Sequence, residues 1–342
     1  MALLFSVLSC FLFCIAPIYA NENERPPSQK EIQKELDHAQ QEFDEAKKMF
    51  NPWYAGPLLT GSAHVMPMGS FNIQPYLFVT TNFAQYDSNR KSQNIPNLLQ
   101  VNIPVILQTG IFPGIDLSVV PQYLHNQQSS KSYDYVGDTS LQFGFQLLQE
   151  TPYLPAIKLG ISPSIPTGKY KWLNPSRLGL DATGSGSYST QFSLNFSKVV
   201  WWLMLHPMAF RLSLNYKYSP KVHVRDFNSY GGGYGTDGKV KPGDNVTTNF
   251  AVEYSFTQNW VFATDFSYVY NKKSTFTGNP GTDATGATAS VGSPQSDQFS
   301  IAPAIEYNPA PTLGFLAGVW FTATGKNSFN FVSGILTMTA GF

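Results

Sequence analysis

The sequence predicts an all-β fold: a single-chain antiparallel transmembrane β-barrel of about 12 strands, preceded by a short amphipathic periplasmic helix. The first reason is composition, because aromatic residues make up 15% of the 342 residues and charged residues only 13%. A usual soluble domain carries about twice that share of charge. The second reason is that apolar residues alternate with polar ones, whereas a membrane helix needs a run of roughly 20 apolar residues. The third is that short and long connections alternate between these segments.

The first 20 residues form an apolar segment that ends in small residues before Asn21. This pattern predicts a signal peptide over residues 1–20, cleaved after Ala20 and exported through the general secretory pathway. Both cysteines, Cys10 and Cys14, lie inside it, so we expect no disulfide and no thiolate metal site in the mature chain. The 22 basic and 22 acidic residues balance, which argues against a nucleic-acid partner. We expect neither a metal nor a cofactor.

Residues 28–50 predict an amphipathic helix within a periplasmic region, residues 21–55. Ser28 suits the N-cap, Glu31 completes a capping box, and Asn51-Pro52 ends the helix. An apolar stripe follows spacings of four and three residues: Ile32, Leu36, Ala39, Phe43, Ala46 and Phe50. Three interpretations remain open: a helix resting on the barrel or a neighbour, a coiled-coil seam that makes a homo-oligomer through residues 28–50, and a plug inside the barrel.

From Gly69 onward the apolar residues recur with a period of two. In the clearest segment one face carries Val246, Thr248, Phe250, Val252, Tyr254 and Phe256, and the other carries Thr247, Asn249, Ala251, Glu253 and Ser255. The first face suits lipid and the second a polar interior. A soluble sandwich alternates too, but aromatic residues at strand ends are typical of membrane interfaces.

Twelve segments of this kind follow one another, and an even number is typical of bacterial single-chain barrels. They cover residues 70–83, 97–109, 114–125, 137–149, 154–167, 185–198, 207–219, 244–257, 259–272, 297–308, 312–324 and 330–342. Long polar connections lie at 126–136, 168–184, 220–243 and 273–296, with short turns between them. Short periplasmic turns and long external loops place both termini in the periplasm of a Gram-negative bacterium.

The chain ends on Phe342 at the end of an alternating segment. A terminal Phe in this position is similar to the signal that the barrel-assembly machinery of the outer membrane recognises. We therefore expect Phe342 to act as an assembly signal. The assembly machinery, outer-membrane lipid and lipopolysaccharide are the expected partners.

Short motifs rich in Gly and Pro recur in order along residues 56–342. They are GPLLTG at 56–61, PMG at 67–69, QPYLF at 74–78, VGDT at 136–139, PTGKY at 166–170 and TGSGSY at 183–188. In this order they resemble the family of outer-membrane proteins named for the MetA pathway of phenol degradation. The resemblance implies a barrel over residues 56–342 that carries small, aromatic or hydrophobic compounds across the outer membrane. It supplies no binding residues.

Two other functional classes compete with a channel. A structural or adhesin-like barrel would be filled by bulky side chains, whereas the predicted inward faces carry mostly Ser, Asn, Gln, Thr and Gly, which favours a channel. A hydrolase built on a barrel would need a nucleophile beside a His base. His125 and His223 fall at external loop edges, and no Gly-x-Ser-x-Gly motif occurs. We therefore do not expect an enzyme.

Few charged residues fall on the inward faces: Lys158, Arg211, Glu253, Asp265 and Glu306. Each lies about three to five residues from the periplasmic end of its strand, so their depths are similar. Arg211 and Glu253 fall on neighbouring strands and are expected to face each other directly, as are Glu253 and Asp265. Two interpretations remain open: a salt-bridged belt that satisfies buried charge, and a constriction that sets ion selectivity.

Overall fold

The computed structural model describes residues 28–49, 53–201, 203 and 206–342. The expected signal peptide at 1–20 and Phe50 of the predicted helix stripe lie outside these residues. Within the described residues, no helix is both long enough and apolar enough to cross a membrane.

The predicted helix is present as α2 (Gln29–Met49). Its capping box forms as expected, because the Ser28 N–H donates to Glu31 Oε2 at 2.6 Å and the Glu31 N–H donates to Ser28 Oγ at 3.4 Å. The hydrogen bond from the Ser28 N–H lowers the pKa of the Glu31 carboxyl group. On the apolar stripe, Ile32 and Leu36 are exposed and Phe43 is buried. The three interpretations of the stripe therefore remain predictions.

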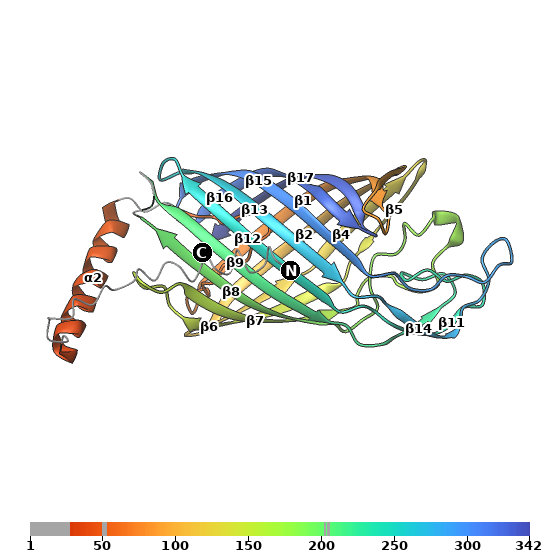
Figure 1. Cartoon of the computed structure of the whole chain (residues 1–342), viewed down its shortest axis with the longest axis horizontal. Coiled ribbons are helices and arrows are strands. Elements are labelled where there is room, and N and C mark those ends of the chain that lie inside the picture. Colours follow the sequence, from red (N-terminus) through yellow and green to blue (C-terminus); the bar gives the residue numbers. More distant parts are fainter. Residues whose placement is uncertain (1–27, 50–52, 202, 204–205) are drawn as a thin grey trace. The chain divides into compact units, whose positions relative to one another are not determined.

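The rest of the chain forms one antiparallel β-barrel with strongly tilted strands (Figure 1). Its strands are β1 (Phe71–Tyr86), β2 (Ser92–Phe112), β3 (Ile115–Val120), β4 (Gln122–Gln128), β5 (Lys131–Val136), β6 (Thr139–Leu148), β7 (Ala156–Ile165), β8 (Thr190–Val200), β9 (Met208–Tyr218), β12 (Asn245–Ser255), β13 (Trp260–Asn271), β15 (Ser296–Ala310), β16 (Leu313–Lys326) and β17 (Phe329–Gly341). The first strand, β1, pairs with both β2 and β17, so the sheet closes on itself.

Two of the barrel strands are bent, and each bend separates two of the elements named above. Pro121, which has no N–H to donate, separates β3 from β4, and both halves pair with β2. Gly137 and Asp138 separate β5 from β6 in the same way. With each bent pair taken as one strand, the barrel has twelve strands, which confirms the predicted fold class.

The two faces of the strands differ as the period of two predicts. On β17 the inward Ile335 is 1% exposed, whereas the neighbouring outward Leu336 is 55% exposed. On β12 the inward Asn249, Glu253 and Ser255 are buried. Successive side chains of a strand point to opposite faces of the sheet. On each strand, the exposed apolar side chains therefore mark the face that suits lipid.

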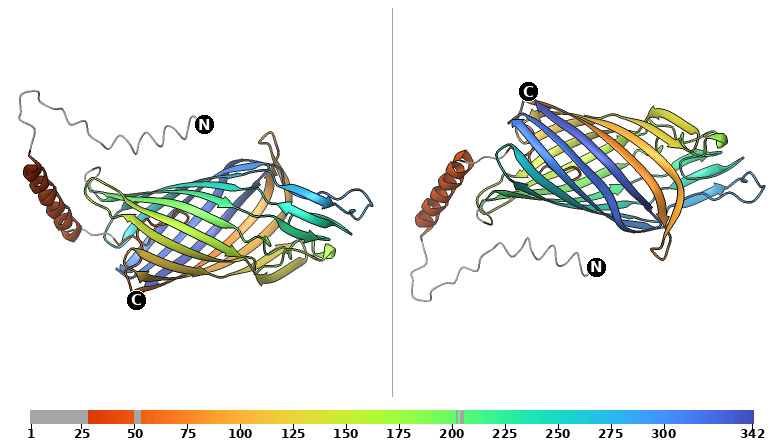
Figure 2. Two further views of the ribbon diagram at one scale, coloured as in Figure 1. Left: turned by 90° about the horizontal axis from the view of Figure 1, so that it is seen from below. Right: turned by 90° about the horizontal axis from the view of Figure 1, so that it is seen from above.

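The long connections contain more regular structure than the sequence predicts. Residues 126–136, expected as a loop, complete β4 and form β5. Within 220–243 and 273–296, β10 (Val222–Arg225), β11 (Asp237–Lys241) and β14 (Thr275–Asn279) pair into a separate three-stranded sheet. It extends beyond one end of the barrel (Figures 1 and 2). Val222, Val224 and Val240 form its buried core, so the long loops pack on their own apolar side chains.

Three of the short motifs meet at the bend before β6. Asp138 Oδ1 accepts the Gly168 N–H at 3.1 Å, and Asp138 Oδ2 accepts the Ser185 N–H at 2.8 Å and the Ser185 Oγ–H at 2.7 Å. Residues 185–189, expected to begin a strand, therefore precede β8 as an irregular segment that is attached to Asp138. One carboxylate thus joins VGDT, PTGKY and TGSGSY.

Candidate functional site

Residues 53–69, called the luminal segment below, cross the interior of the barrel before β1 begins. The segment starts where the Trp53 N–H donates to the Gln258 carbonyl in the β12–β13 turn, at 3.2 Å. It ends beside β2, where the Gly69 N–H donates to the Gly110 carbonyl at 3.0 Å. Since β2 and β13 lie far apart in the strand order, the segment spans the bore near the end with the short turns.

On the first wall, two carboxylates hold the segment by its backbone. Glu306 Oε2 on β15 accepts the Ala55 N–H at 3.0 Å and the Gly56 N–H at 3.4 Å. Asp265 on β13 accepts the N–H groups of Leu59 and Thr60 at 3.2 and 2.9 Å, together with the Thr60 hydroxyl at 2.6 Å. Both carboxyl groups are completely buried. The segment therefore supplies the donors that a buried carboxylate needs.

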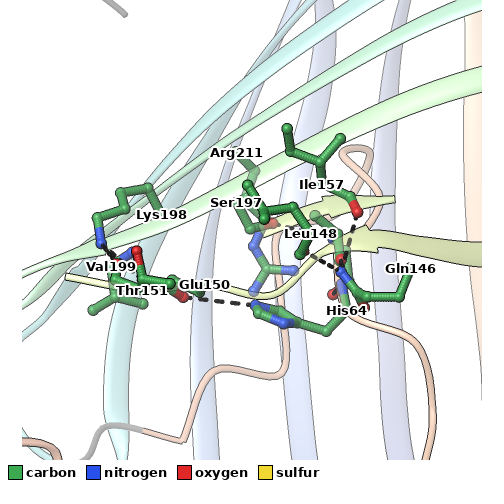
Figure 3. Close-up of polar contacts among 12 residues, drawn as sticks. His64, Gln146, Leu148, Glu150, Thr151, Ile157, Ser197, Lys198, Val199 and Arg211 are labelled. Atoms are coloured by element: carbon green, nitrogen blue, oxygen red, sulfur yellow. Dashed lines mark hydrogen bonds and ion pairs between the residues drawn. The ribbon is translucent and has the colours of Figure 1, made fainter. Parts of the chain in front are cut away.

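On the opposite wall, three different strands continue the attachment. The Ala63 N–H donates to Ser197 Oγ on β8 at 3.1 Å, and Gln146 Nε2 on β6 donates to the Ala63 carbonyl at 2.7 Å. The Val65 N–H donates to Gln146 Oε1 at 3.0 Å, so this one amide binds the segment twice. The Met66 N–H then donates to Asp116 Oδ2 at 3.2 Å. Figure 3 shows Gln146 and Ser197 close to His64 of the segment.

His64 lies beside a small charged cluster at this edge (Figure 3). Its Nε2 is 3.7 Å from Glu150 Oε2, and Lys198 Nζ is 3.5 Å from Glu150 Oε1. The Val199 N–H donates to the same Oε1 at 2.8 Å, and Glu150 is almost wholly buried. The β6–β7 connection is thus joined to both β8 and the luminal segment.

Glycines in the wall make room for the segment. A Cβ added at Gly318 on β16 would lie 2.6 Å from Leu58 Cδ1, and one added at Gly110 on β2 would overlap the backbone of Met66 and Pro67. Leu58 itself packs into the buried apolar cluster inside the barrel, beside Leu316 and Ile335. The bore is therefore shaped around the segment on both sides.

The predicted charge belt is present, but its members do not face one another as expected. Arg211 and Glu253 pair through Nε–Oε2 at 2.6 Å and Nη2–Oε1 at 3.2 Å. The register places Ala251 opposite both Arg211 and Asp265, so Glu253 meets each of them diagonally. The expectation of direct opposition was wrong because it took strand ends as level, whereas barrel closure staggers neighbouring strands.

Lys158, the remaining member, lies on the other wall. Its Nζ is 4.0 Å from Asp116 Oδ2 and donates to the His64 carbonyl at 3.1 Å. Of the five predicted charges, Glu306, Asp265 and Lys158 therefore bind the segment directly. The other two, Arg211 and Glu253, bind each other, and Gly56 of the segment lies close to the Arg211 guanidinium.

Sequence reasoning missed the luminal segment itself, together with Asp116, Gln146, Ser197 and Glu150. Residues 56–61 did stand out as a motif that belongs to no strand, and its Gly and Pro suit an irregular backbone in a tight place. Nothing in the sequence indicated that this motif lies inside the barrel. The inward Asp116 on β3 could have been found from the alternation, because it occupies an inward position.

A polar cavity of about 350 Å³ remains next to the segment. Its lining includes Leu59, Gly61 and Ser62 of the segment and inward residues of β8, β9 and β12. Along β8 it extends from Asn195 to Gln191, which is the direction of the long loops. The segment thus crosses the bore, and a cavity remains beside it.

The two histidines that a hydrolase site could use, His125 and His223, each lie beside a carboxylate. His125 Nδ1 lies 2.7 Å from Asp134 Oδ1, and His223 Nε2 lies 2.9 Å from Asp237 Oδ1. Neither histidine contacts a serine hydroxyl among the interactions of the described residues. In the part of the chain that the structure describes, no group of three or more His, Cys, Asp and Glu side chains could hold a metal ion.

Comparisons with known proteins identify the fold. No protein-family model and no curated protein matches the chain. Among solved structures it is similar to the COG4313 outer membrane channel from Pseudomonas putida F1, with a TM-score of 0.62, 11% identity, and 83% of this chain and 100% of that chain covered. The chain has the fold of an outer-membrane β-barrel.

Two further structures share parts of the barrel less closely. The translocator domain of the autotransporter NalP from Neisseria meningitidis gives a TM-score of 0.44 at 9% identity, with 90% of this chain and 97% of that chain covered. The monoaromatic hydrocarbon channel CymD gives 0.38 at 9% identity, with 81% and 89% covered. The resemblance to the MetA-pathway family remains a prediction.

Proposed function

We propose that this chain is an outer-membrane channel for small molecules, and that the luminal segment is its gate. The observation that carries the proposal is the way in which the segment is held. Hydrogen bonds with side chains of seven strands attach a stretch of the same chain across the bore. Such bonds can be exchanged for bonds to water, so the segment can leave without unfolding the barrel.

The alternative of a structural barrel that transports nothing fits the interior less well. A barrel that serves only as a scaffold gains stability when strand side chains fill its lumen. Here glycines on β2 and β16 lie against the segment, and a cavity remains beside it. A movable closure requires this arrangement, whereas a permanent filling does not.

In this proposal the barrel spans the outer membrane, with the long loops outside and both termini in the periplasm. The even number of strands and the clustering of long loops at one end support this orientation. The partners would be outer-membrane lipid, lipopolysaccharide and the barrel-assembly machinery. Assembly of several copies through residues 28–50 remains a further prediction.

A reversible lock tests the gate. The Asp265→Ala/Glu306→Ala variant removes the carboxylates of the first wall and should raise the current across a planar bilayer. Adding Ala63→Cys and Ser197→Cys, where the Ala63 nitrogen lies 3.1 Å from Ser197 Oγ, allows a disulfide on the second wall. The mature chain holds no other cysteine, since both lie in the expected signal peptide.

Oxidation, which forms the disulfide, should return the current of this variant to the wild-type level. A reductant should raise the current again. The matched control carries Ala63→Cys without its partner and should respond to neither treatment. A current that stays high in the oxidised, disulfide-bonded protein would contradict the gate.

A hydrophobic cargo is a second candidate, favoured by one observation on the outer wall. An apolar groove of about 530 Å³ lies across β13, β15, β16, β17, β1 and β2. It is lined by outward residues such as Trp260, Ile305 and Leu336, and it reaches the inward Leu316. A small aromatic or hydrophobic compound dissolved in lipid would partition into such a groove. Quenching of Trp260 fluorescence by a brominated aromatic, compared with Trp260→Phe, tests this candidate.

A further inference from the structure

The cavity beside the luminal segment has a defined floor and wall. Leu59, Gly61 and Ser62 form its floor, and on β9 its wall continues from Ser213 to Asn215. Its volume of about 350 Å³ falls at the lower end of the range for small-molecule sites. A solute that enters from the long loops would meet this space before the closed segment.

The lining of the cavity is dominated by neutral hydrogen-bonding groups. Twelve of its 19 residues are Ser, Thr, Asn or Gln, and Phe143 is the only aromatic residue among them. Several of these side chains orient one another: Gln191 Nε2 donates to Asn215 Oδ1 at 3.2 Å, and Ser213 Oγ donates to Asn195 Oδ1 at 2.6 Å. Amides held in this way present fixed donors and acceptors to a bound solute.

One lining residue has a buried acceptor without a partner. Asn249 on β12 is 8% exposed, and its Nδ2 donates to the Leu59 carbonyl at 3.4 Å. Its Oδ1 is buried and has no hydrogen-bond partner among the described residues. A buried acceptor is stabilised when a donor reaches it, and a hydroxyl group supplies both a donor and an acceptor.

The charges of the lining cancel. Asp116 and Lys158 are its only charged residues and lie 4.0 Å apart. Asp116 also accepts from Gln108 Nε2 at 2.7 Å, and Lys158 donates to the His64 carbonyl at 3.1 Å. A charged solute would have to displace one of these partners. A hydrocarbon would leave the amides without hydrogen bonds.

We propose that this cavity binds a neutral, polyhydroxylated solute of about monosaccharide size. The proposal rests on the channel function above and names its substrate class. The alternation of hydroxyl donors and acceptors around such a solute matches the amide and hydroxyl groups of the wall. The solute class therefore differs from the aromatic or hydrophobic compounds that the family resemblance implies.

Binding to the mature protein in a sugar-free detergent tests the proposal. Glucose and myo-inositol are the neutral probes, gluconate is the charged probe and toluene is the hydrocarbon, each followed by saturation-transfer NMR. Glucose or myo-inositol should bind in the millimolar range, as expected for a small polar ligand in water. Asn249→Leu should weaken that binding about tenfold, because it replaces a polar residue of the lining with an apolar one.

The matched control is Asn82→Leu, which changes a buried luminal asparagine on β1 outside the cavity. Its affinity for the neutral probes should equal that of the wild type. Stronger binding of toluene or gluconate than of both neutral probes, equal losses in the two variants, or no binding of any probe would overturn the proposal. The proposal that the luminal segment is a gate is tested separately, by the current measurement. If the neutral probes bind but the current does not respond, only the gate is overturned. If the current responds but the neutral probes do not bind, only the proposed solute class is overturned.

Discussion

Thr60 and Asp265 are joined by two hydrogen bonds in the interior of the barrel. The Thr60 N–H and Oγ–H both donate to Asp265 Oδ1, at 2.9 and 2.6 Å, although 205 residues separate the two positions in the chain. Asp265 is completely buried. This contact fixes the middle of the luminal segment to β13, so it should set how often the segment leaves the wall.

Thr60→Val should loosen the segment while leaving the barrel intact. The substitution keeps the shape of the side chain and removes one hydrogen bond to a buried carboxyl group, which costs about 1–3 kcal/mol. Maleimide labelling of an added Ala63→Cys, a position that is fully buried in the closed state, should therefore accelerate about 5- to 100-fold. The control is Thr264→Val, which lies on the outward face of β13 beside Asp265. It should leave the labelling rate unchanged. Equal rates in the two variants would show that the Thr60 contact does not hold the segment.

Gly110→Ala should strain the end of the segment. A Cβ at this position would overlap the backbone of Met66 and Pro67, which cannot rotate away as a side chain can. We expect the free energy of unfolding in urea to fall by about 1–3 kcal/mol. Gly334→Ala on β17, where an added Cβ has no atom within 4 Å, serves as the control and should change it by less than about 0.5 kcal/mol. An unchanged stability of Gly110→Ala would mean that the segment does not pack against β2.

Glu253→Gln should destabilise the barrel, because it leaves the Arg211 guanidinium buried without its two-oxygen partner. Glu253 is fully buried and the Arg211 side chain is 11% exposed, so we expect a loss of about 3–5 kcal/mol in the free energy of unfolding. Asp237→Asn removes the exposed partner of Arg225, 3.9 Å away, and should cost less than about 1 kcal/mol. If Glu253→Gln shifts ion selectivity but not stability, the charge belt acts as a constriction.

Asp138→Ala should release the connection between β7 and β8. The carboxylate accepts three hydrogen bonds from Gly168 and Ser185, and no other side chain of the described residues joins the same three motifs. Limited proteolysis should then cut residues 168–187 faster, while the barrel remains resistant. Asp283→Ala is the control, since this exposed carboxylate binds only within its own loop. Equal cleavage rates for both variants would show that Asp138 does not hold the connection between β7 and β8.

Phe342→Ala should lower the amount of protein in the outer membrane without preventing refolding in detergent. The backbone of Phe342 bonds to Phe71 in both directions, at 2.8 and 3.1 Å, whereas its side chain is 78% exposed. The substitution therefore keeps the strand pairing and removes only an exposed ring. Phe315→Ala, another exposed aromatic on the outer face, should leave the abundance unchanged. Equal abundance of Phe342→Ala and the wild type would exclude an assembly signal.

Local patterns in the sequence determined most of the barrel. The alternation that separates Val246 from Thr247 depends only on neighbouring residues, because successive side chains of a strand point to opposite faces. The twelve strands, the lipid faces, the capping box at Ser28 and the inward position of the five charges all followed from such short-range rules. The bends at Pro121 and Asp138 and the small sheet of the long loops did not, since their partners lie on other strands or loops.

Only the tertiary structure decided what the inward charges bind. Glu306 reaches Ala55 across 251 residues of sequence, and Asp265 reaches Thr60 across 205. Such pairs depend on the stagger between neighbouring strands in the closed barrel and on the path of an irregular segment. Neither produces a repeating pattern of residues in the sequence. The sequence by itself therefore determined a barrel with charges inside it. Closure of that barrel around residues 53–69 decided that three of the charges, Lys158, Asp265 and Glu306, bind the segment that crosses the bore.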